Sequence, residues 1–94
     1  MIKHIVCFKM QKEETIDKAI EILSSMKGNV PQIVEMEVGK DFLHSARSYD
    51  IILQVTLSSK EELDAYQKDK YHCDVVKTYM HANVASSIAI DYEF

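Results

Sequence analysis

The sequence predicts an α+β domain whose strands and helices follow one another in the order β-α-β-β-α-β. Four segments show the two-residue alternation of apolar side chains that is typical of strands, and two show the spacing of amphipathic helices. The chain contains only two glycines and one proline, so its regular segments are interrupted in few places. With 94 residues, the chain is expected to form one domain over residues 1–94.

The first strand and the first helix are predicted in the N-terminal third of the chain. Residues 2–10 alternate between two faces, and one face carries His4 among the apolar side chains of Ile2, Val6, Phe8 and Met10. From Thr15 the spacing becomes helical, with an apolar stripe formed by Ile16, Ala19, Ile20, Leu23 and Met26. Gly28 is expected to end this helix, because glycine adopts the left-handed conformation at little cost.

Two further strands are predicted in the middle of the chain. Residues 33–38 alternate, with Glu35 and Glu37 on a polar face that we expect to be solvated, and Gly39 is expected to end the strand. Residues 40–48 show no periodicity and are expected to form a loop. Residues 50–57 form the third predicted strand, and Asp50 at its start is expected to be a turn or pairing residue.

The C-terminal part predicts a second helix and a fourth strand. Ser58 or Ser59 is placed to cap the helix, with Glu61 and Glu62 as capping-box partners. The polar residues 67–70 are expected to break this helix, and helical spacing resumes from His72. Residues 84–92 alternate again and close the chain.

This order of elements is that of the ferredoxin-like fold, a four-stranded antiparallel sheet with the helices on one face. The first, third and fourth strands carry apolar side chains on both faces, although the helices can cover only one. An uncovered apolar face predicts a partner, and a chain this short buries only about 60–65% of its extended surface. We therefore expect a homodimer in which two sheets pack face to face, with Ile52 on the partner side.

Charge and residue spacing argue against several classes of protein. The net charge of −4 is unfavourable for a nucleic-acid-binding protein, which presents a basic surface. No apolar run approaches the ~18 residues needed to span a membrane, and the N-terminus lacks the signal-peptide pattern. Cys7 and Cys73 lie far apart, and the four histidines show no metal-ligand spacing. We expect a cytoplasmic protein with two free thiols and without a metal or other cofactor.

Several stretches of the chain carry a family resemblance. They are IKHIV at 2–6, Val30-Pro31, EVGKDF at 37–42, SYDIIL at 48–53, residues 63–72, and Ile90-Asp91-Tyr92. Together they resemble the stress-responsive A/B barrel (Dabb) domain family over nearly the whole chain. The resemblance implies a dimeric α+β barrel of two ferredoxin-like protomers packed through their sheets. Most members of the family look like small dimeric proteins without an assigned reaction.

The chain has a more distant resemblance to olivetolic acid cyclase, a plant polyketide cyclase of this family that needs no cofactor. The resemblance implies a pocket lined by His4, Tyr66 and His72, which match a strand-one histidine, a helix tyrosine and a histidine six residues later. The relatives usually carry a proline shortly before the last histidine, where this chain has Asp69-Lys70-Tyr71. An aromatic residue is also common where strand three ends in Leu57. The loop that orients His72 is therefore expected to have its own shape.

These three residues have both chemical and structural interpretations. A neutral imidazole can take a proton next to a carbonyl, and a phenol can bond to the resulting enolate oxygen. On one continuous helix, Tyr66 and His72 would point about 120° apart, so they converge only if the helix breaks between them. Otherwise His72 is a core histidine, and His4 on its apolar strand face is a buried histidine with a hydrogen-bonded neighbour.

Three functions remain open at this point. The first is a small dimeric, stress-related Dabb-domain protein that binds a small organic ligand between helices and sheet through His4, Tyr66 and His72. The second is a cofactor-independent enzyme of cyclase or lyase type, in which His72 is the base and Tyr66 the oxyanion partner for a β-keto or aromatic compound. The third is a structural stress-associated protein without pocket chemistry. His44 and His81 are expected at the surface.

Overall fold

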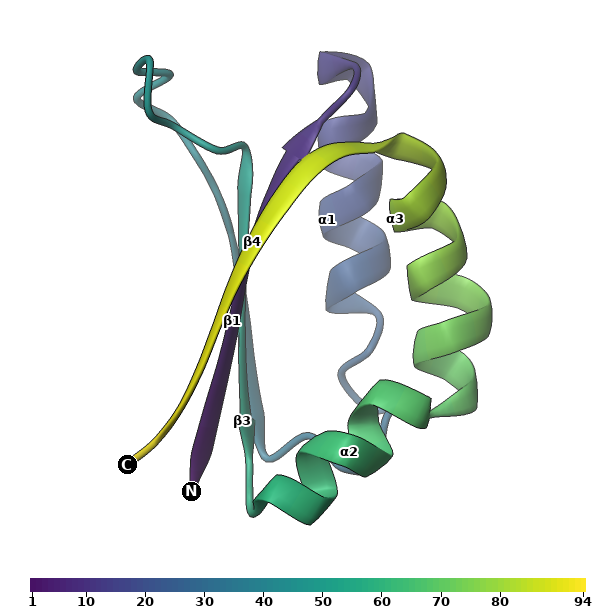
Figure 1. Ribbon diagram of the computed structural model, residues 1–94. Coiled ribbons are helices and arrows are strands. Elements are labelled where there is room, and N and C mark those ends of the chain that lie inside the picture. The colour runs from purple at the N-terminus through teal and green to yellow at the C-terminus, as the bar shows by residue number, and fades with distance from the viewer.

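Four antiparallel strands form one sheet, and every helix lies on the same face of it (Figure 1). The computed structural model describes residues 1–94 and places the strands in the order β2-β3-β1-β4. The strands are β1 (Ile2–Met10), β2 (Glu35–Lys40), β3 (Ile51–Leu57) and β4 (Val84–Glu93). The predicted order of elements and the ferredoxin-like arrangement are confirmed.

The helical layer consists of three α-helices and a π-helical segment. They are α1 (Ile16–Ser24) after a 3-10 turn at Glu13–Thr15, α2 (Lys60–Lys68), the π-helical segment His72–Lys77, and α3 (Thr78–Asn83). The chain leaves the helical conformation at Asp69, whose ψ is 135°, so the predicted break within residues 67–70 is confirmed. Gly28 has a φ of 86°, the left-handed conformation expected after the first helix. None of the helices has the length and apolar character needed to cross a bilayer.

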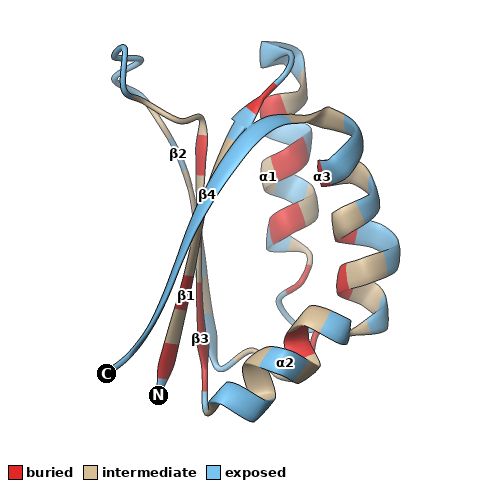
Figure 2. Ribbon diagram, in the orientation of Figure 1, coloured by how far each residue is buried: buried red, intermediate tan, exposed pale blue.

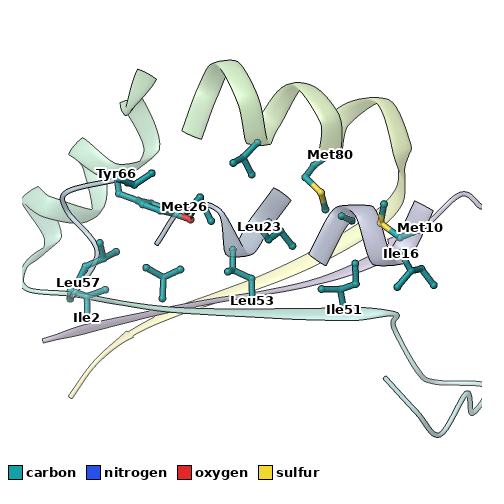
Figure 3. Packing of buried hydrophobic residues seen from close by; sticks show 14 residues of the cluster. Ile2, Met10, Ile16, Leu23, Met26, Ile51, Leu53, Leu57, Tyr66 and Met80 are labelled. Carbon is teal, nitrogen blue, oxygen red and sulfur yellow. Dashed lines mark hydrogen bonds between the residues drawn. The ribbon is translucent and has the colours of Figure 1, made fainter. Parts of the chain in front are cut away.

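The buried core fills the space between the helices and the sheet (Figure 2). It combines the apolar stripe of α1 with the helix-facing side of β3 and with Tyr66, Val76 and Met80 from the second helical region. Figure 3 shows Leu23 and Met26 lying between the sheet and the other helices. The opposite face of the sheet has no helix over it. There Ile88, Ile90 and Tyr92 of β4 are 54%, 60% and 45% exposed, which confirms that the helices cover only one side.

β2 is displaced from its predicted position. It runs from Glu35 to Lys40 rather than from residue 33 to 38, so the predicted end at Gly39 is wrong. Gly39 pairs with Ile52 of β3, and a side chain in its place would put its Cβ 3.0 Å from Ile52 Cγ2. The glycine is therefore explained by the close approach of Ile52 rather than by a turn. Glu35 and Glu37 are exposed, as expected.

β4 contains an irregularity that simple alternation does not predict. Its pairing with β1 shifts register after Lys9, so that Lys9 pairs with Ser86 and Met10 with Val84. The extra residue, Ala85, forms a bulge that turns Val84 toward the helices. Regular alternation over residues 84–92 would put Val84 on the same face as Ile88, and the bulge corrects this expectation.

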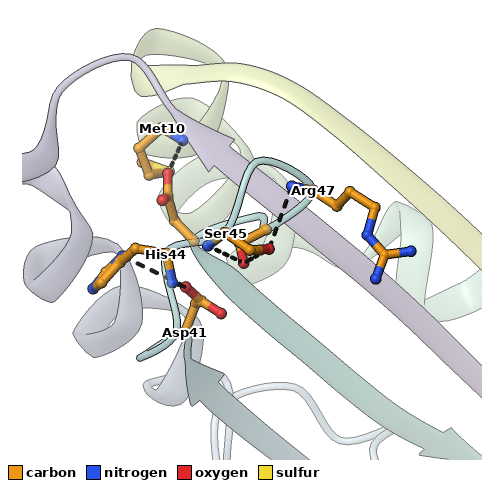
Figure 4. Close-up of polar contacts among 7 residues, drawn as sticks. Met10, Asp41, His44, Ser45 and Arg47 are labelled. Carbon is orange, nitrogen blue, oxygen red and sulfur yellow. Dashed lines mark hydrogen bonds and ion pairs between the residues drawn. The ribbon is translucent and has the colours of Figure 1, made fainter.

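The segment between β2 and β3, residues 41–50, forms a protruding loop (Figure 4), so the loop predicted for residues 40–48 is present except at Lys40, which belongs to β2. The Asp41 carboxylate accepts a hydrogen bond from the backbone N–H of His44 at 2.8 Å. The N–H of Ser45 donates to the Ser48 hydroxyl at 2.9 Å. Asp50 accepts from the backbone N–H of Met10 at 2.7 Å, which confirms its pairing role. His44 is exposed, as expected.

The N-terminus of α2 provides a test of the local sequence signals. Ser59 is the cap residue, and its hydroxyl accepts a hydrogen bond from the backbone N–H of Glu62 at 3.1 Å. We expect Ser59→Ala to lower the free energy of unfolding by about 1 kcal/mol, because a helix N–H loses its partner. Urea denaturation measures this loss. Ser58→Ala is the matched control, and an equal loss in both variants would contradict the assignment of the cap.

Candidate ligand-binding site

A cavity of about 220 Å³ lies between the helices and the helix-facing side of the sheet. Its apolar walls come from β1, β3, α1 and the second helical region, and its polar lining includes His4, Tyr66 and His72. The volume is below the roughly 300–1,000 Å³ of sites for drug-sized ligands, so it suits a smaller molecule. A larger depression of about 360 Å³ beside Lys3, Glu35 and Gln54 lies on the outer face of the sheet and has a mainly polar lining.

The structure brings His4, Tyr66 and His72 together around the tyrosine ring. The ring centroids of Tyr66 and His72 are 4.3 Å apart, and their planes are tilted by 34°. His4 meets Tyr66 from β1, edge to face, with a centroid distance of 5.6 Å. His4 and His72 are buried, at 6% and 7% exposed, and Tyr66 is fully buried. Residues far apart in the sequence thus form one polar cluster within an apolar surrounding.

The break at Asp69 is what allows Tyr66 and His72 to meet. The backbone N–H of Asp69 donates to the Tyr66 carbonyl at 3.2 Å, which ends α2. The Asp69 carboxylate accepts from the backbone N–H of His72 at 3.1 Å and begins the next helical segment. Asp69 therefore satisfies backbone groups at both sides of the bend, and no proline is required there.

The hydrogen bonds of His72 determine which of its ring nitrogens carries the proton. Nδ1 lies 2.9 Å from the backbone carbonyl oxygen of Tyr66. Since a carbonyl oxygen can only accept, Nδ1 must be the donor, and Nε2 of the neutral ring is left as an acceptor. Burial lowers the pKa of His72, and the positive charges of Lys77 and His4 lower it further, against the opposing effects of the Tyr66 carbonyl and Asp69. The arrangement favours a neutral imidazole.

The lowered pKa of His72 predicts a pH dependence of stability. An unfolded histidine titrates near 6.5, so between that pH and the lower folded pKa the unfolded chain binds more protons than the native one. The stabilisation is present above pH 6.5 and is lost as the pH falls through the folded pKa. We expect the free energy of unfolding to fall more steeply with acid in the wild type than in His72→Asn, whose amide retains a donor. Urea denaturation from about pH 5 to 8 measures both slopes, and identical slopes would exclude His72 as their source.

His4 is held by an acidic residue on the neighbouring strand. His4 and Asp91 are cross-strand partners in the β1–β4 pairing, and His4 Nδ1 is hydrogen-bonded to Asp91 Oδ1. The side chain of Asp91 is 42% exposed, whereas that of His4 is 7% exposed. An ionised carboxylate can only accept, so Nδ1 is the donor and Nε2 the free nitrogen. Asp91 is not among the predicted site residues, because its contact with His4 follows only from the register of β1 and β4.

Tyr66 is placed to donate a hydrogen bond rather than to ionise. Burial raises the pKa of its phenol, and the negative charge of Asp91 raises it further. The hydroxyl points toward Met26 (Figure 3) and donates to its Sδ at 3.8 Å. A thioether sulfur is a weak acceptor, so this contact can be exchanged for a stronger one.

Lys77 and His81 also line the cavity, and neither is part of the predicted site. The Lys77 ammonium donates to the backbone carbonyl of Gln67 at 2.8 Å. His81 is exposed, as expected, but it stands at the open side of the cavity. His72 and Lys77 are the first and last residues of the π-helical segment. Its i→i+5 hydrogen bonds give the side chains a different angular spacing from that of an α-helix. An α-helical projection of the sequence therefore does not group them.

Several solved structures share this fold at low sequence identity. A dimeric ferredoxin-like protein of unknown function from Thermobifida fusca is 21% identical, covers 99% of this chain and 90% of its own, and has a TM-score of 0.85. A dimeric protein of ferredoxin-like fold from Bacteroides fragilis is 20% identical over 99% and 95%, with a TM-score of 0.84. Hydroxynitrile lyase from Passiflora edulis is 16% identical over 97% and 90%, with a TM-score of 0.80.

The family assignment comes from the sequence itself. No curated protein matches the chain at a significant level. The model of the stress responsive A/B barrel domain matches residues 2–94, which contain every strand and helix described above. The chain therefore belongs to the Dabb family.

Proposed function

We propose that this protein binds a small organic molecule carrying a hydroxyl or enol group in the cavity between its helices and sheet. The observation that supports this most directly is the polar cluster of His4, Tyr66 and His72 in an otherwise apolar cavity. Such a combination of apolar walls and a few polar groups is typical of small-molecule sites.

The hydrogen bonds of the two histidines indicate what the ligand must offer. Nδ1 of His72 donates to the Tyr66 carbonyl, and Nδ1 of His4 to the Asp91 carboxylate. Neither Nε2 atom has a hydrogen-bond partner within the protein, and Nε2 of the neutral His72 ring is an acceptor. A ligand that donates a hydrogen bond can pair with this nitrogen, whereas a hydrocarbon would displace water from it and leave it without a partner, so the donor is preferred.

Phenol and toluene test this proposal, because they have nearly the same shape and differ in the donor. Calorimetric titration is expected to show that the wild type prefers phenol several-fold, the effect of about 1 kcal/mol for a neutral hydrogen bond. His72→Asn should lose the preference, since it keeps a donor toward the Tyr66 carbonyl but lacks Nε2. His44→Asn, in the exposed loop, is the matched control. Equal affinity for both probes, or binding of neither, would contradict the proposal.

A second candidate function is cofactor-independent proton transfer on a β-keto or aromatic compound. The observation that favours it is the fixed tautomer of His72, whose neutral Nε2 can accept a proton from the carbon next to a carbonyl. Negative charge then develops on the carbonyl oxygen. The Tyr66 hydroxyl, on leaving Met26, can donate to that oxygen. Asp91 is a positioning residue that holds His4 beside Tyr66.

Hydrogen–deuterium exchange at the methyl group of acetophenone in D₂O tests this chemistry. His72 Nε2 takes the methyl proton as the enolate forms, and the imidazolium exchanges this proton for a deuteron from D₂O. Return of the deuteron to the carbon restores the ketone and the neutral ring. We expect exchange above the buffer rate in the wild type and a loss of about 10²–10⁴-fold in His72→Asn. Exchange at the buffer rate in the wild type would reject the enzymatic candidate and leave the binding function in place.

The assembly belongs to the same proposal. We propose a homodimer packed through the outer faces of the two sheets. Its support is the row of exposed apolar side chains on β4 and the description of two structures of the same fold as dimeric. Burying this row against a second copy would remove an apolar surface from water.

A further inference from the structure

We propose that the ligand of this cavity is an organic anion whose carboxylate lies against the Lys77 ammonium and the His81 imidazole at the open side. The inference rests on the proposed function, because it names the chemical class of the molecule that the same cavity takes.

The cavity lining includes the Lys77 ammonium and no carboxylate, although the protein as a whole is acidic. The chain carries 15 acidic and 11 basic side chains. Among the residues that line the cavity there are Lys77 and three histidines, but no aspartate or glutamate. The neighbouring carboxylates of Asp69 and Asp91 lie outside the lining, and they are engaged by the His72 backbone N–H and by His4 respectively. The distribution of charge therefore favours a negative ligand over a positive one.

Lys77 is held at the cavity wall without a counter-ion. Its ammonium donates to the Gln67 carbonyl at 2.8 Å, and both residues line the cavity. Five of the ten lysines pair with a carboxylate, and among the five that do not, Lys77 is the one that lines this cavity. An ammonium has three donors, so two remain for a ligand. A half-buried cation of this kind is stabilised when an anion joins it.

One end of the cavity is apolar and buried, and the other is polar and exposed, which suits a small organic acid. Leu23, Leu53 and Val76 at the inner wall are almost completely buried. At the other end, His81 and Ser87 are exposed and Lys77 is half-buried. A carboxylate there keeps part of its hydration while the ring or chain of the ligand is buried. The positive charge of Lys77 also reaches the inner cluster, since it contributes to the lowered pKa of His72.

The test compares 3-hydroxybenzoate with 3-hydroxybenzamide, which share a hydroxyl-bearing ring and differ in charge. We expect calorimetric titration of the wild type to give a dissociation constant about tenfold lower for the acid, the size of one charge-assisted hydrogen bond. Lys77→Met, which keeps much of the chain length without the charge, should abolish this preference, and Lys77→Arg should retain it. Lys18→Met is the matched control, because Lys18 is on α1 with only a surface ion pair to Glu21.

The outcomes separate this inference from the function on which it rests. Equal affinity of the wild type for acid and amide would overturn the anion assignment and leave ligand binding intact. If Lys77→Met keeps the full preference for the acid, the carboxylate does not lie against Lys77, and the proposed position of the ligand is overturned. Binding of neither compound, together with none of phenol, would overturn both proposals. The wild-type comparison needs no variant, so it tests the charge of the ligand even if a Lys77 variant does not fold.

Discussion

Ile90→Asp is expected to convert the protein from a dimer into a monomer. Ile90 is 60% exposed and lies on the uncovered face of the sheet, in the same row as Ile88 and Tyr92. In a face-to-face dimer this row is buried, so an aspartate within it would be a charge without a partner. Such a buried charge costs about 3–5 kcal/mol, and both copies carry it, so the dissociation constant of the dimer should rise by at least about two orders of magnitude.

Sedimentation velocity at micromolar concentration measures this change directly. Val75→Asp is the matched control, since Val75 is also an exposed apolar residue, 41% exposed, but it lies on the helical layer. It should remain dimeric, whereas Ile52→Asp, on the same sheet face as Ile90, should behave like Ile90→Asp. A wild type that sediments as a monomer, or a dimer unaffected by Ile90→Asp, would contradict packing through the sheets.

The element order could be predicted because each segment shows one clear period. The apolar stripe of α1 and the alternation of β1 and β3 need no knowledge of their neighbours, and the polar residues 67–70 mark the helix break. The position of β2 could not be predicted in the same way. Gly39 looks like a strand end, but its role depends on Ile52 of another strand. The bulge at Ala85 likewise depends on the pairing with β1.

The candidate site likewise contains residues that the sequence predicts and residues that only the pairing of elements reveals. His4, Tyr66 and His72 could be proposed from the family resemblance, together with a helix break that local composition indicates. Asp91 could not, because its link to His4 depends on the register of two strands. Lys77 and His81 could not be assigned to the site from an α-helical projection, because the π-helical segment changes the angular spacing of the side chains after His72. Local periodicity therefore predicts elements well, and it misses residues whose role comes from pairing between elements.

Leu23→Ala is expected to lower the free energy of unfolding by about 3–5 kcal/mol, because it removes a buried side chain from the centre of the core. Leu23 is 1% exposed, packs from α1 toward the sheet, and lines the ligand cavity. Leu57 is the matched control, since it is fully buried on β3 and does not line the cavity. Urea denaturation should therefore give losses of similar size for Leu23→Ala and Leu57→Ala.

The two leucines differ in what their loss does to the ligand. Leu23→Ala removes three carbon atoms from the cavity wall, so 4-propylphenol should bind more tightly relative to phenol than it does in the wild type. A ligand that binds the native state also raises stability by mass action, so 4-propylphenol should restore part of the loss in Leu23→Ala. Leu57→Ala opens space elsewhere, and its preference between the two phenols should stay that of the wild type. Calorimetric titration of both variants with the two phenols measures this difference. The same affinity ratio of 4-propylphenol to phenol in both variants would mean that the ligand does not lie against Leu23. Because the destabilisation is matched, any difference in ligand size reports the position of the ligand and not the weakened fold.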